Sequence, residues 1–245
     1  MPAAKHLTAP RRAMVLAAGL GLRMRPITEH TPKPLIPVAG RTMLDRTLDH
    51  LRAQGVERMV VNAHWLGHKI HDHLRGQPDI VLSDEDELLE TGGGVTKALP
   101  LLGEAPFFVC NSDIVWLNGP VPALTRLARA WDPARMDALL LLQRTATAVG
   151  YEGRGDFFLD PSGVPRRRAE GEVAPLLFAG VQILHPRLFE DCRVERFSLN
   201  RIYDRALAAG RLSAIVHDGA WYHVGDPAAL AEVEARLSAV EGAEG

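Results

Sequence analysis

Short apolar runs alternate with segments of helical spacing through the first 145 residues of the chain. Five of the runs are continuously apolar and of strand length, which is typical of strands buried on both faces of a sheet. They are RAMVLAA (12–18), RMVVNAH (58–64), DIVLSDE (79–85), FFVCNSD (107–113) and DALLLLQ (137–143). Apolar residues at helical spacing predict helices between them, over 43–54, 66–75, 94–102 and 121–131. Strands separated by helices indicate a parallel sheet with right-handed crossovers.

The pattern changes after residue 145, where turn residues and short apolar runs become frequent. Residues 155–168 predict a hairpin that turns within 160–163, and 175–186 and 212–225 predict further strands. Ser198 and Asp226 are placed to begin two more helices. We therefore expect an α/β fold of Rossmann-like, three-layer α/β/α type, with a mixed, mainly parallel sheet and a small antiparallel extension. We expect a single domain over 11–245, after a disordered tail at 1–10.

Composition and charge narrow the classes of function. The chain has 245 residues and a net charge of −2, so a general partner of nucleic acid or of a membrane surface is not expected. No apolar run is long enough to span a bilayer. The N-terminus lacks the apolar core of a secretory signal, and Cys110 lies in an apolar run where a buried, reduced thiol is expected. These features predict a cytoplasmic protein.

A glycine-rich and cationic loop follows the first predicted strand, where ligands of open α/β sheets bind. Gly19 and Gly21 permit backbone conformations that expose N–H groups, and Arg23 and Arg25 can bind phosphate oxygens. Met24 stands where the dinucleotide-binding motif needs its third glycine, and the Gly-Lys-Ser/Thr of the P-loop is absent. Taken alone, the Gly-x-Gly also fits a plain strand-to-helix turn.

Two prolines flank a single lysine further along the same loop, in Pro32-Lys33-Pro34. Proline fixes the backbone on both sides of Lys33, which aims the lysine in one direction. The alternative is a rigid surface loop with an incidental lysine. We expect Arg23 and Lys33 to lie in solvent-facing loops.

The segment LAAGLGLRMRPITEHTPKPLIPVAGRTML resembles the opening of the sugar-1-phosphate nucleotidyltransferases, and weaker matches follow at TGGGV, NSD and WYHVGDP. The resemblance implies transfer of a nucleotidyl group from a nucleoside triphosphate to a sugar 1-phosphate, with release of pyrophosphate. The length and the segments LETGGG, GDFFL and FAGVQI are most similar to N-acetylmuramate 1-phosphate uridylyltransferases of cell-wall recycling. Mannose-1-phosphate guanylyltransferases are the second choice, and a non-catalytic, nucleotide-sensing subunit is the rival from another class.

The family's binding residues can be placed on this chain one by one. The resemblance implies that Arg23 grips the triphosphate and that Lys33 contacts the phosphates at the reacting centre, so both are expected to be catalytic. It implies that Gly93 packs against the base. The full set expected to bind nucleotide is Leu16, Ala18, Gly19, Gly21, Arg23, Gly93 and Asp113.

The resemblance also implies a Mg²⁺ cofactor held by Asp113, which follows an apolar run as expected for a ligand site. The family's second metal-binding aspartate is replaced by His223, and neutral imidazole is a poor Mg²⁺ ligand. His223 instead fits a contact to phosphate or to a metal-bound water. Asp226 is a substitute metal ligand, although Asp226-Pro227 also fits a plain helix cap.

Gly155, Arg168 and Gly180 are expected to bind the sugar phosphate, because they lie in or beside the segments that match on the sugar side. The run Arg166–Arg168 suits an anionic group of the sugar, such as a lactyl carboxylate, or is an exposed charged strand. The histidines of HWLGHKIHDHL (64–74) are expected on a solvated helix face rather than on zinc. The expected partners are small molecules only, and the chain is expected to be a monomer or a small homo-oligomer.

Overall fold

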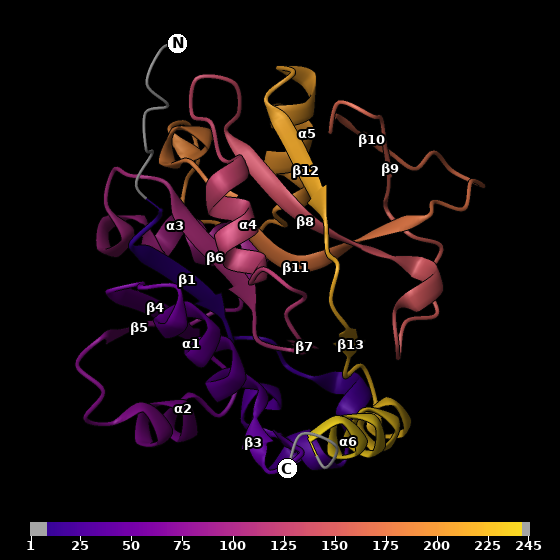
Figure 1. Ribbon diagram of the computed structural model, residues 1–245. Helices are drawn as coiled ribbons and strands as arrows, with labels where there is room; N and C mark the ends of the chain where they lie inside the picture. Colours follow the sequence, from indigo (N-terminus) through magenta and orange to yellow (C-terminus); the bar gives the residue numbers. More distant parts are fainter. Residues whose placement is uncertain (1–8, 242–245) are drawn as a thin grey trace.

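A computed structural model describes residues 9–241, and Figure 1 shows its arrangement. The strands are β1 (Arg12–Leu16), β2 (Pro37–Val38), β3 (Arg41–Thr42), β4 (Arg58–Ala63), β5 (Ile80–Asp84), β6 (Phe107–Asn111), β7 (Ile114–Trp116), β8 (Ala138–Arg144), β9 (Phe157–Leu159), β10 (Pro165–Arg167), β11 (Leu176–Leu184), β12 (Leu212–Val216) and β13 (Trp221–His223). The α-helices are α1 (Met43–Ala53), α2 (Gly67–Leu74), α3 (Glu90–Leu102), α4 (Ala123–Ala130), α5 (Asn200–Ala208) and α6 (Pro227–Glu241). Short 3₁₀ helices are η1 (Leu22–Met24), η2 (Ile27–Glu29), η3 (Lys33–Leu35), η4 (Thr145–Thr147) and η5 (Pro186–Phe189).

A nine-stranded central sheet confirms the predicted fold class (Figure 1). Strands β5, β4, β1 and β6 are parallel neighbours, so the first half of the chain forms the predicted crossovers. Strand β11 then pairs antiparallel with both β6 and β8, and β12 pairs parallel with β8. The predicted hairpin forms as β9 and β10, which extend from the edge of β11. The sheet is therefore mixed, with a small antiparallel extension.

Helices cover both faces of the sheet and make three layers. On one face, α1, α2 and α4 pack onto alternate strand residues such as Val15 and Val61. On the other face, α3 and α5 pack onto the residues between them, such as Met14 and Val60. A third cluster places α6 against β7 and β13 and against the loop after β1, through Val233, Val115 and Met24. That cluster fixes the ribbon β7–β13 beside the glycine-rich loop.

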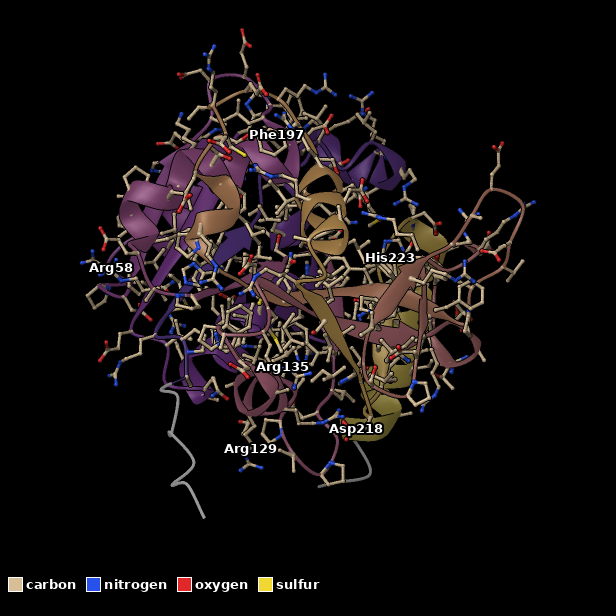
Figure 2. The ribbon with its side chains drawn as sticks, turned by 90° about the horizontal axis from the view of Figure 1, so that it is seen from above. Arg58, Arg129, Arg135, Phe197, Asp218 and His223 are labelled. Carbon is tan, nitrogen blue, oxygen red and sulfur yellow. The ribbon has the colours of Figure 1, made fainter. Side chains whose placement is uncertain are left out.

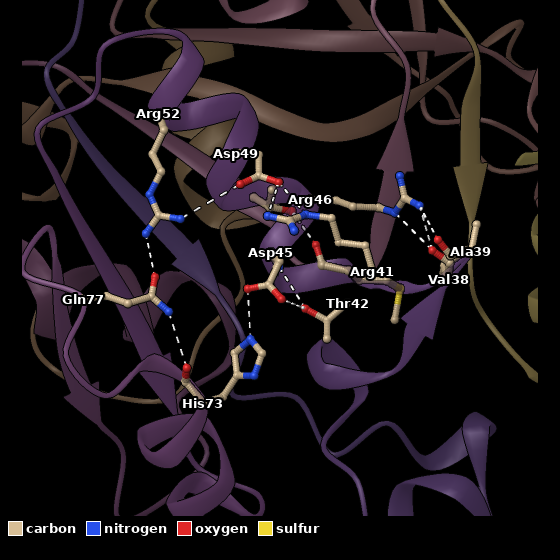
Figure 3. Close-up of polar contacts among 12 residues, drawn as sticks. Val38, Ala39, Arg41, Thr42, Asp45, Arg46, Asp49, Arg52, His73 and Gln77 are labelled. Carbon is tan, nitrogen blue, oxygen red and sulfur yellow. Dashed lines mark hydrogen bonds and ion pairs between the residues drawn. The ribbon is translucent and has the colours of Figure 1, made fainter. Parts of the chain in front are cut away.

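Helix α1 begins with the cap that its sequence predicts. Thr42 Oγ1 accepts a hydrogen bond from the backbone N–H of Asp45 at 3.0 Å, and Asp45 also meets His73 Nε2 at 2.9 Å (Figure 3). Arg46 Nη2 donates to the carbonyl oxygen of Val38 at 2.8 Å. These contacts join α1 to α2 and to β2, the strand that follows η3. They therefore hold this part of the chain from two sides.

Two predicted elements differ from the structure. Helix α3 begins at Glu90 rather than at residue 94, and its first turn is held by the loop at Phe197, whose carbonyl oxygen accepts from the backbone N–H of Gly92. Residues 212–225 form two strands, β12 and β13, which lie in different sheets. Cys110 is buried as expected, and burial raises the pKa of its thiol to about 12.

Within residues 9–241 no helix combines the length and apolar character needed to cross a membrane. The tail expected over 1–10 lies outside the described residues except for its last two positions.

Candidate active site

A cavity of about 600 Å³ opens at the carboxyl ends of β1, β4 and β6, in the place predicted from the parallel sheet. The structure brings together seven of the expected site residues in its wall: Leu16, Ala18, Gly19, Gly21, Arg23, Lys33 and Asp113. These residues come from segments far apart in the sequence, so the fold rather than the local sequence assembles the site.

The loop after β1 needs glycine at two positions for different reasons. Gly21 has a φ of +62°, and a Cβ there would lie 2.9 Å from Cγ2 of Thr28. Thr28 Oγ1 also donates to the carbonyl oxygen of Gly21 at 2.9 Å, which keeps the turn closed. Gly19 has open space where a Cβ would stand, and it lines the cavity. A ligand can therefore approach the Gly19 backbone closely.

Lys33 points inward and pairs with Asp113. Its Nζ lies 2.8 Å from Oδ2 of Asp113, and Lys33 is only 8% exposed. The expectation of a solvent-facing Lys33 is therefore wrong, because η3 turns the lysine toward the carboxylate at the end of β6. Arg23 is exposed at the edge of the cavity, as expected.

Asp113 lies between β6 and β7, two residues after β6 ends, and its side chain is 37% exposed. Burial alone would raise the pKa of its carboxyl group, but the charge and the hydrogen bond of the Lys33 ammonium outweigh burial and lower the pKa below its ordinary value. The site therefore holds a carboxylate that stays ionised at neutral pH.

His223, labelled in Figure 2, ends β13. Strand β13 pairs with β7, and His223 lies opposite Ile114. Its Nδ1 lies 3.1 Å from the carbonyl oxygen of Gly150, which assigns the ring proton to Nδ1 and leaves Nε2 as an acceptor. Burial lowers the pKa of His223, an effect that Asp113 opposes and Lys33 and Arg23 reinforce. The ring is therefore neutral at pH 7.

Asp226 is a helix cap. Its Oδ1 accepts a hydrogen bond at 2.9 Å from the backbone N–H of Ala229, in the first turn of α6, and Asp226 is exposed outside the cavity. Its expected role as a metal ligand is therefore not supported, because the carboxylate satisfies the start of α6 instead.

The residues of the site supply only part of the ligands that Mg²⁺ needs. Among residues 9–241 no group of three or more His, Cys, Asp or Glu side chains is arranged to hold a metal by itself. Mg²⁺ commonly binds one or two carboxylates and completes its coordination with substrate phosphates and water. Asp113 offers one such carboxylate beside a loop suited to phosphates, and His223 Nε2 is an acceptor for a bound water.

The glycines at the start of α3 make room for the loop around Glu195 and Phe197, which is distant in the sequence. A Cβ on Gly93 would lie 2.1 Å from the carbonyl oxygen of Glu195, and a Cβ on Gly92 would lie 2.3 Å from the ring of Phe197. Figure 2 labels Phe197. Gly93 is not among the residues that line the cavity, whereas Glu90 and Thr91 of the same turn are. The expected contact of Gly93 with the base stays a prediction.

Comparisons with known proteins agree with this geometry. The MobA-like NTP transferase domain family matches residues 13–193. The chain belongs to this family. It is 46% identical to the N-acetylmuramate alpha-1-phosphate uridylyltransferase of Caulobacter vibrioides over 237 residues, which cover 94% of this chain and 98% of that protein. It is 35% identical to the enzyme of the same name from Neisseria meningitidis, over 93% of this chain and 99% of that protein. The predicted resemblance is confirmed, and the chain is a nucleotidyltransferase.

Solved structures show the same fold. HddC from Yersinia pseudotuberculosis, complexed with GMP-PN, superposes with a TM-score of 0.75 at 21% identity and covers 93% of this chain and 99% of its own. A UDP-glucose pyrophosphorylase complexed with UDP-glucose gives a TM-score of 0.76 at 16% identity, over 93% of this chain and 98% of its own.

The residues expected to bind the sugar phosphate do not line this transferase's cavity. Gly180, with a φ of +78°, packs against Asn111, which does line the cavity. A Cβ on Gly155 would lie 2.2 Å from the carbonyl oxygen of Ala174. Both glycines therefore allow close packing, Gly180 beside the cavity and Gly155 against the backbone of Ala174, and their contact with a sugar stays a prediction.

The arginines of β10 and the turn after it are already engaged. Arg166 pairs with Glu172 at 2.8 Å, and Arg167 Nε lies 2.6 Å from an oxygen of Asp204. Arg168 Nε donates at 3.0 Å to the carbonyl oxygen of Gly155. These contacts hold the three guanidinium groups within the protein, and the expectation that Arg168 and its neighbours meet a carboxylate of the sugar stays a prediction.

Substituting Gly93 by alanine should destabilise the transferase by about 1–3 kcal/mol, because the new Cβ overlaps the carbonyl oxygen of Glu195. The loop that carries Ser198 into the cavity wall would shift with it. Denaturant unfolding measures the loss, with Gly67→Ala as the matched control, since Gly67 is also a helical glycine and a Cβ there would lie 3.6 Å from its nearest neighbour, Cβ of Ala63. A loss no larger than that of the control would contradict the close approach.

Sequence reasoning missed several polar residues in the wall, and Asn62 and Glu85 are two of them. Each stands at the carboxyl end of a predicted apolar strand, which is the signal that singled out Asp113. The same signal would have found both.

Proposed function

We propose that this transferase moves the uridylyl group of UTP onto N-acetylmuramate 1-phosphate and releases pyrophosphate. The observation that carries the proposal is 46% identity over 94% of the chain to an N-acetylmuramate alpha-1-phosphate uridylyltransferase, combined with a Lys33–Asp113 pair in the wall of the cavity. N-acetylmuramate is a cell-wall sugar, so the proposed setting is peptidoglycan recycling in the cytoplasm, where UTP is found.

The proposed reaction depends on electrostatic stabilisation and needs no general base. A phosphate oxygen of the sugar 1-phosphate attacks the α-phosphorus of UTP, and the bond from that phosphorus to the β-phosphate oxygen breaks. The sugar phosphate is mostly dianionic at neutral pH, since its second pKa is about 6. The barrier is therefore the approach of a dianion to a triphosphate, which fixed cations lower by neutralising charge.

The residues of the cavity divide this work. Lys33, held by Asp113, presents an ammonium where the α-phosphate and the incoming phosphate meet. Arg23, exposed at the cavity edge, binds the leaving pyrophosphate, and the Gly19 backbone lets the triphosphate come close. His223 does not line the cavity but stands opposite Ile114, next in sequence to Asp113, and its neutral Nε2 can accept a hydrogen bond from a water bound there.

Mg²⁺ fits the site as a cofactor that Asp113 would hold together with phosphate oxygens, and when bound it supplies further charge neutralisation. Asp113 then serves two cations, Lys33 and the metal, with its two oxygens.

A substrate panel tests the proposal. Each of the four triphosphates is mixed with N-acetylmuramate 1-phosphate, N-acetylglucosamine 1-phosphate and mannose 1-phosphate, and pyrophosphate release is measured. UTP with N-acetylmuramate 1-phosphate should give the highest kcat/KM, by about tenfold or more over the same triphosphate with N-acetylglucosamine 1-phosphate. A clear preference for GTP with mannose 1-phosphate would replace the proposal with a guanylyltransferase.

A further inference from the structure

Two buried polar side chains in the cavity wall have no role in the proposed reaction. Asn62, in β4, is 2% exposed, and Glu85, directly after β5, is 5% exposed. Both line the cavity, and β4 lies between β1 and β5 in the sheet. Buried polar groups of this kind are kept only where hydrogen bonds satisfy them.

An unbroken series of hydrogen bonds runs through these two side chains. The backbone N–H of Ala17, just after β1, donates to Oδ1 of Asn62 at 2.6 Å. Nδ2 of Asn62 donates to Oε1 of Glu85, also at 2.6 Å. The other carboxylate oxygen, Oε2, accepts from the backbone N–H of Leu89 at 2.9 Å. The series therefore joins the end of β1 to the turn before α3.

Both ends of the series belong to the cavity wall. Ala17 and Ala18 line it on one side, and Leu88 and Glu90 line it on the other. Glu90 has a φ of +58°, an uncommon conformation for a residue other than glycine. Such a turn persists when its surroundings hold it, and the bond from Leu89 to Glu85 is one of those supports.

Helix α3 leaves room for the pair at Gly94. A Cβ on Gly94 would lie 2.7 Å from Oε1 of Glu85 and 2.9 Å from Nδ2 of Asn62. Gly94 therefore packs directly against the two polar side chains. A larger residue at position 94 would displace them, so Gly94 is a third position at which the pair can be tested.

We propose that Asn62 and Glu85 are positioning residues for the nucleoside triphosphate. They hold the wall at Ala17–Ala18 and the wall at Leu88–Glu90 at the separation that the nucleotide requires, and they touch no reacting atom. The inference rests on the proposed function only in taking a nucleoside triphosphate as the occupant of the cavity.

The direction of the hydrogen bonds supplies a sharp test. Asn62→Asp places a second carboxylate against Glu85, and Glu85→Gln leaves one N–H facing another N–H. In the double variant the new aspartate accepts from Ala17 and from the new glutamine, whose carbonyl oxygen accepts from Leu89. All three hydrogen bonds are regained in the double variant, and the net charge is that of the wild type.

The measurement is the Kd of each of the four triphosphates by titration calorimetry, together with KM and kcat. Each single variant should raise the Kd of the best-bound triphosphate about tenfold or more, and the double variant should return it to within about threefold of wild type. The KM of the sugar 1-phosphate should stay nearly unchanged. Thr47→Val is the matched control, since it removes a buried hydroxyl, bonded to Met43, away from the cavity.

The outcomes separate this inference from the proposed function. If both single variants bind the triphosphate as tightly as the wild type, the positioning role alone is overturned. The same holds if the double variant binds no more tightly than the weaker-binding single variant. Single variants with a lower Tm but an unchanged Kd would show that Asn62 and Glu85 only stabilise the fold, and would also overturn the positioning role. A wild type that binds none of the four triphosphates would remove both proposals. Where a variant at 62 or 85 fails to fold, Gly94→Ala takes its place and should weaken triphosphate binding similarly.

Discussion

Replacing Lys33 by alanine should lower kcat for pyrophosphate release by about a hundredfold or more. The Lys33 ammonium is the buried cation of the cavity wall, fixed 2.8 Å from Asp113, so its charge needs no reorganisation when the phosphates arrive. Water that replaced it would have to be reoriented during the reaction. Steady-state kinetics with saturating substrates measures the change.

A matched variant separates the charge of Lys33 from its packing. Methionine has a similar length and fills the same space without a charge, so Lys33→Met should be as inactive as Lys33→Ala. Lys69→Ala serves as the control, because Lys69 bonds a backbone carbonyl of the loop, that of His30, and lies outside the cavity. Normal turnover by Lys33→Met would remove the ammonium from the mechanism.

The parallel half of the fold could be predicted because its signals are local. Continuous apolar runs mark β1, β4, β5 and β6, and their order with the intervening helices fixes the carboxyl edge where the cavity opens. Lys33 and Asp113, which are 80 residues apart, were both expected at this edge, although only the structure shows that they pair. The pairing depends on where η3 turns, and no local pattern encodes that.

The start of α3 shows where local reasoning stops. Helical spacing of apolar residues predicted a beginning at residue 94, and the glycines before it have low helix propensity. Tertiary packing decides otherwise: the carbonyl oxygen of Phe197 accepts from the backbone N–H of Gly92 at 2.8 Å, and side chains larger than hydrogen would collide with that loop. The loop arrives from more than 100 residues away, so its effect is invisible in the sequence around α3.

The arginine run of 166–168 shows the same limit for charge. Three adjacent cations suggest an anionic ligand, but acidic side chains of the protein itself can also pair with them. Arg166 finds Glu172 a few residues on, whereas Arg167 finds Asp204 on α5. The first partner was within reach of sequence reasoning, and the second depends on how α5 packs against the hairpin.

Substituting Asp113 by asparagine should lower kcat/KM by about a thousandfold and raise the Mg²⁺ concentration needed for half-maximal rate. Asparagine keeps the size of the side chain but cannot present two anionic oxygens to Lys33 and a metal. Initial rates across a Mg²⁺ titration measure both effects. Asp226→Asn is the control: it removes the same charge, and asparagine caps α6 equally well, so full activity is expected. Loss of activity there would return Asp226 to the metal site.

The dependence of stability on pH gives Asp113→Asn a second, independent readout. The pKa of Asp113 is lowered in the folded protein, so its carboxylate adds stability above the ordinary carboxyl pKa of about 4, and that stability is lost as pH falls through the lowered value. Asparagine does not titrate, so the variant should melt below the wild type at pH 7 by about 2–4 °C at most, and the gap should close on acidification well below pH 4. A gap that stays constant with pH would mean that Asp113 contributes packing rather than charge, and its pairing with Lys33 would then not be what keeps the lysine oriented toward the phosphates.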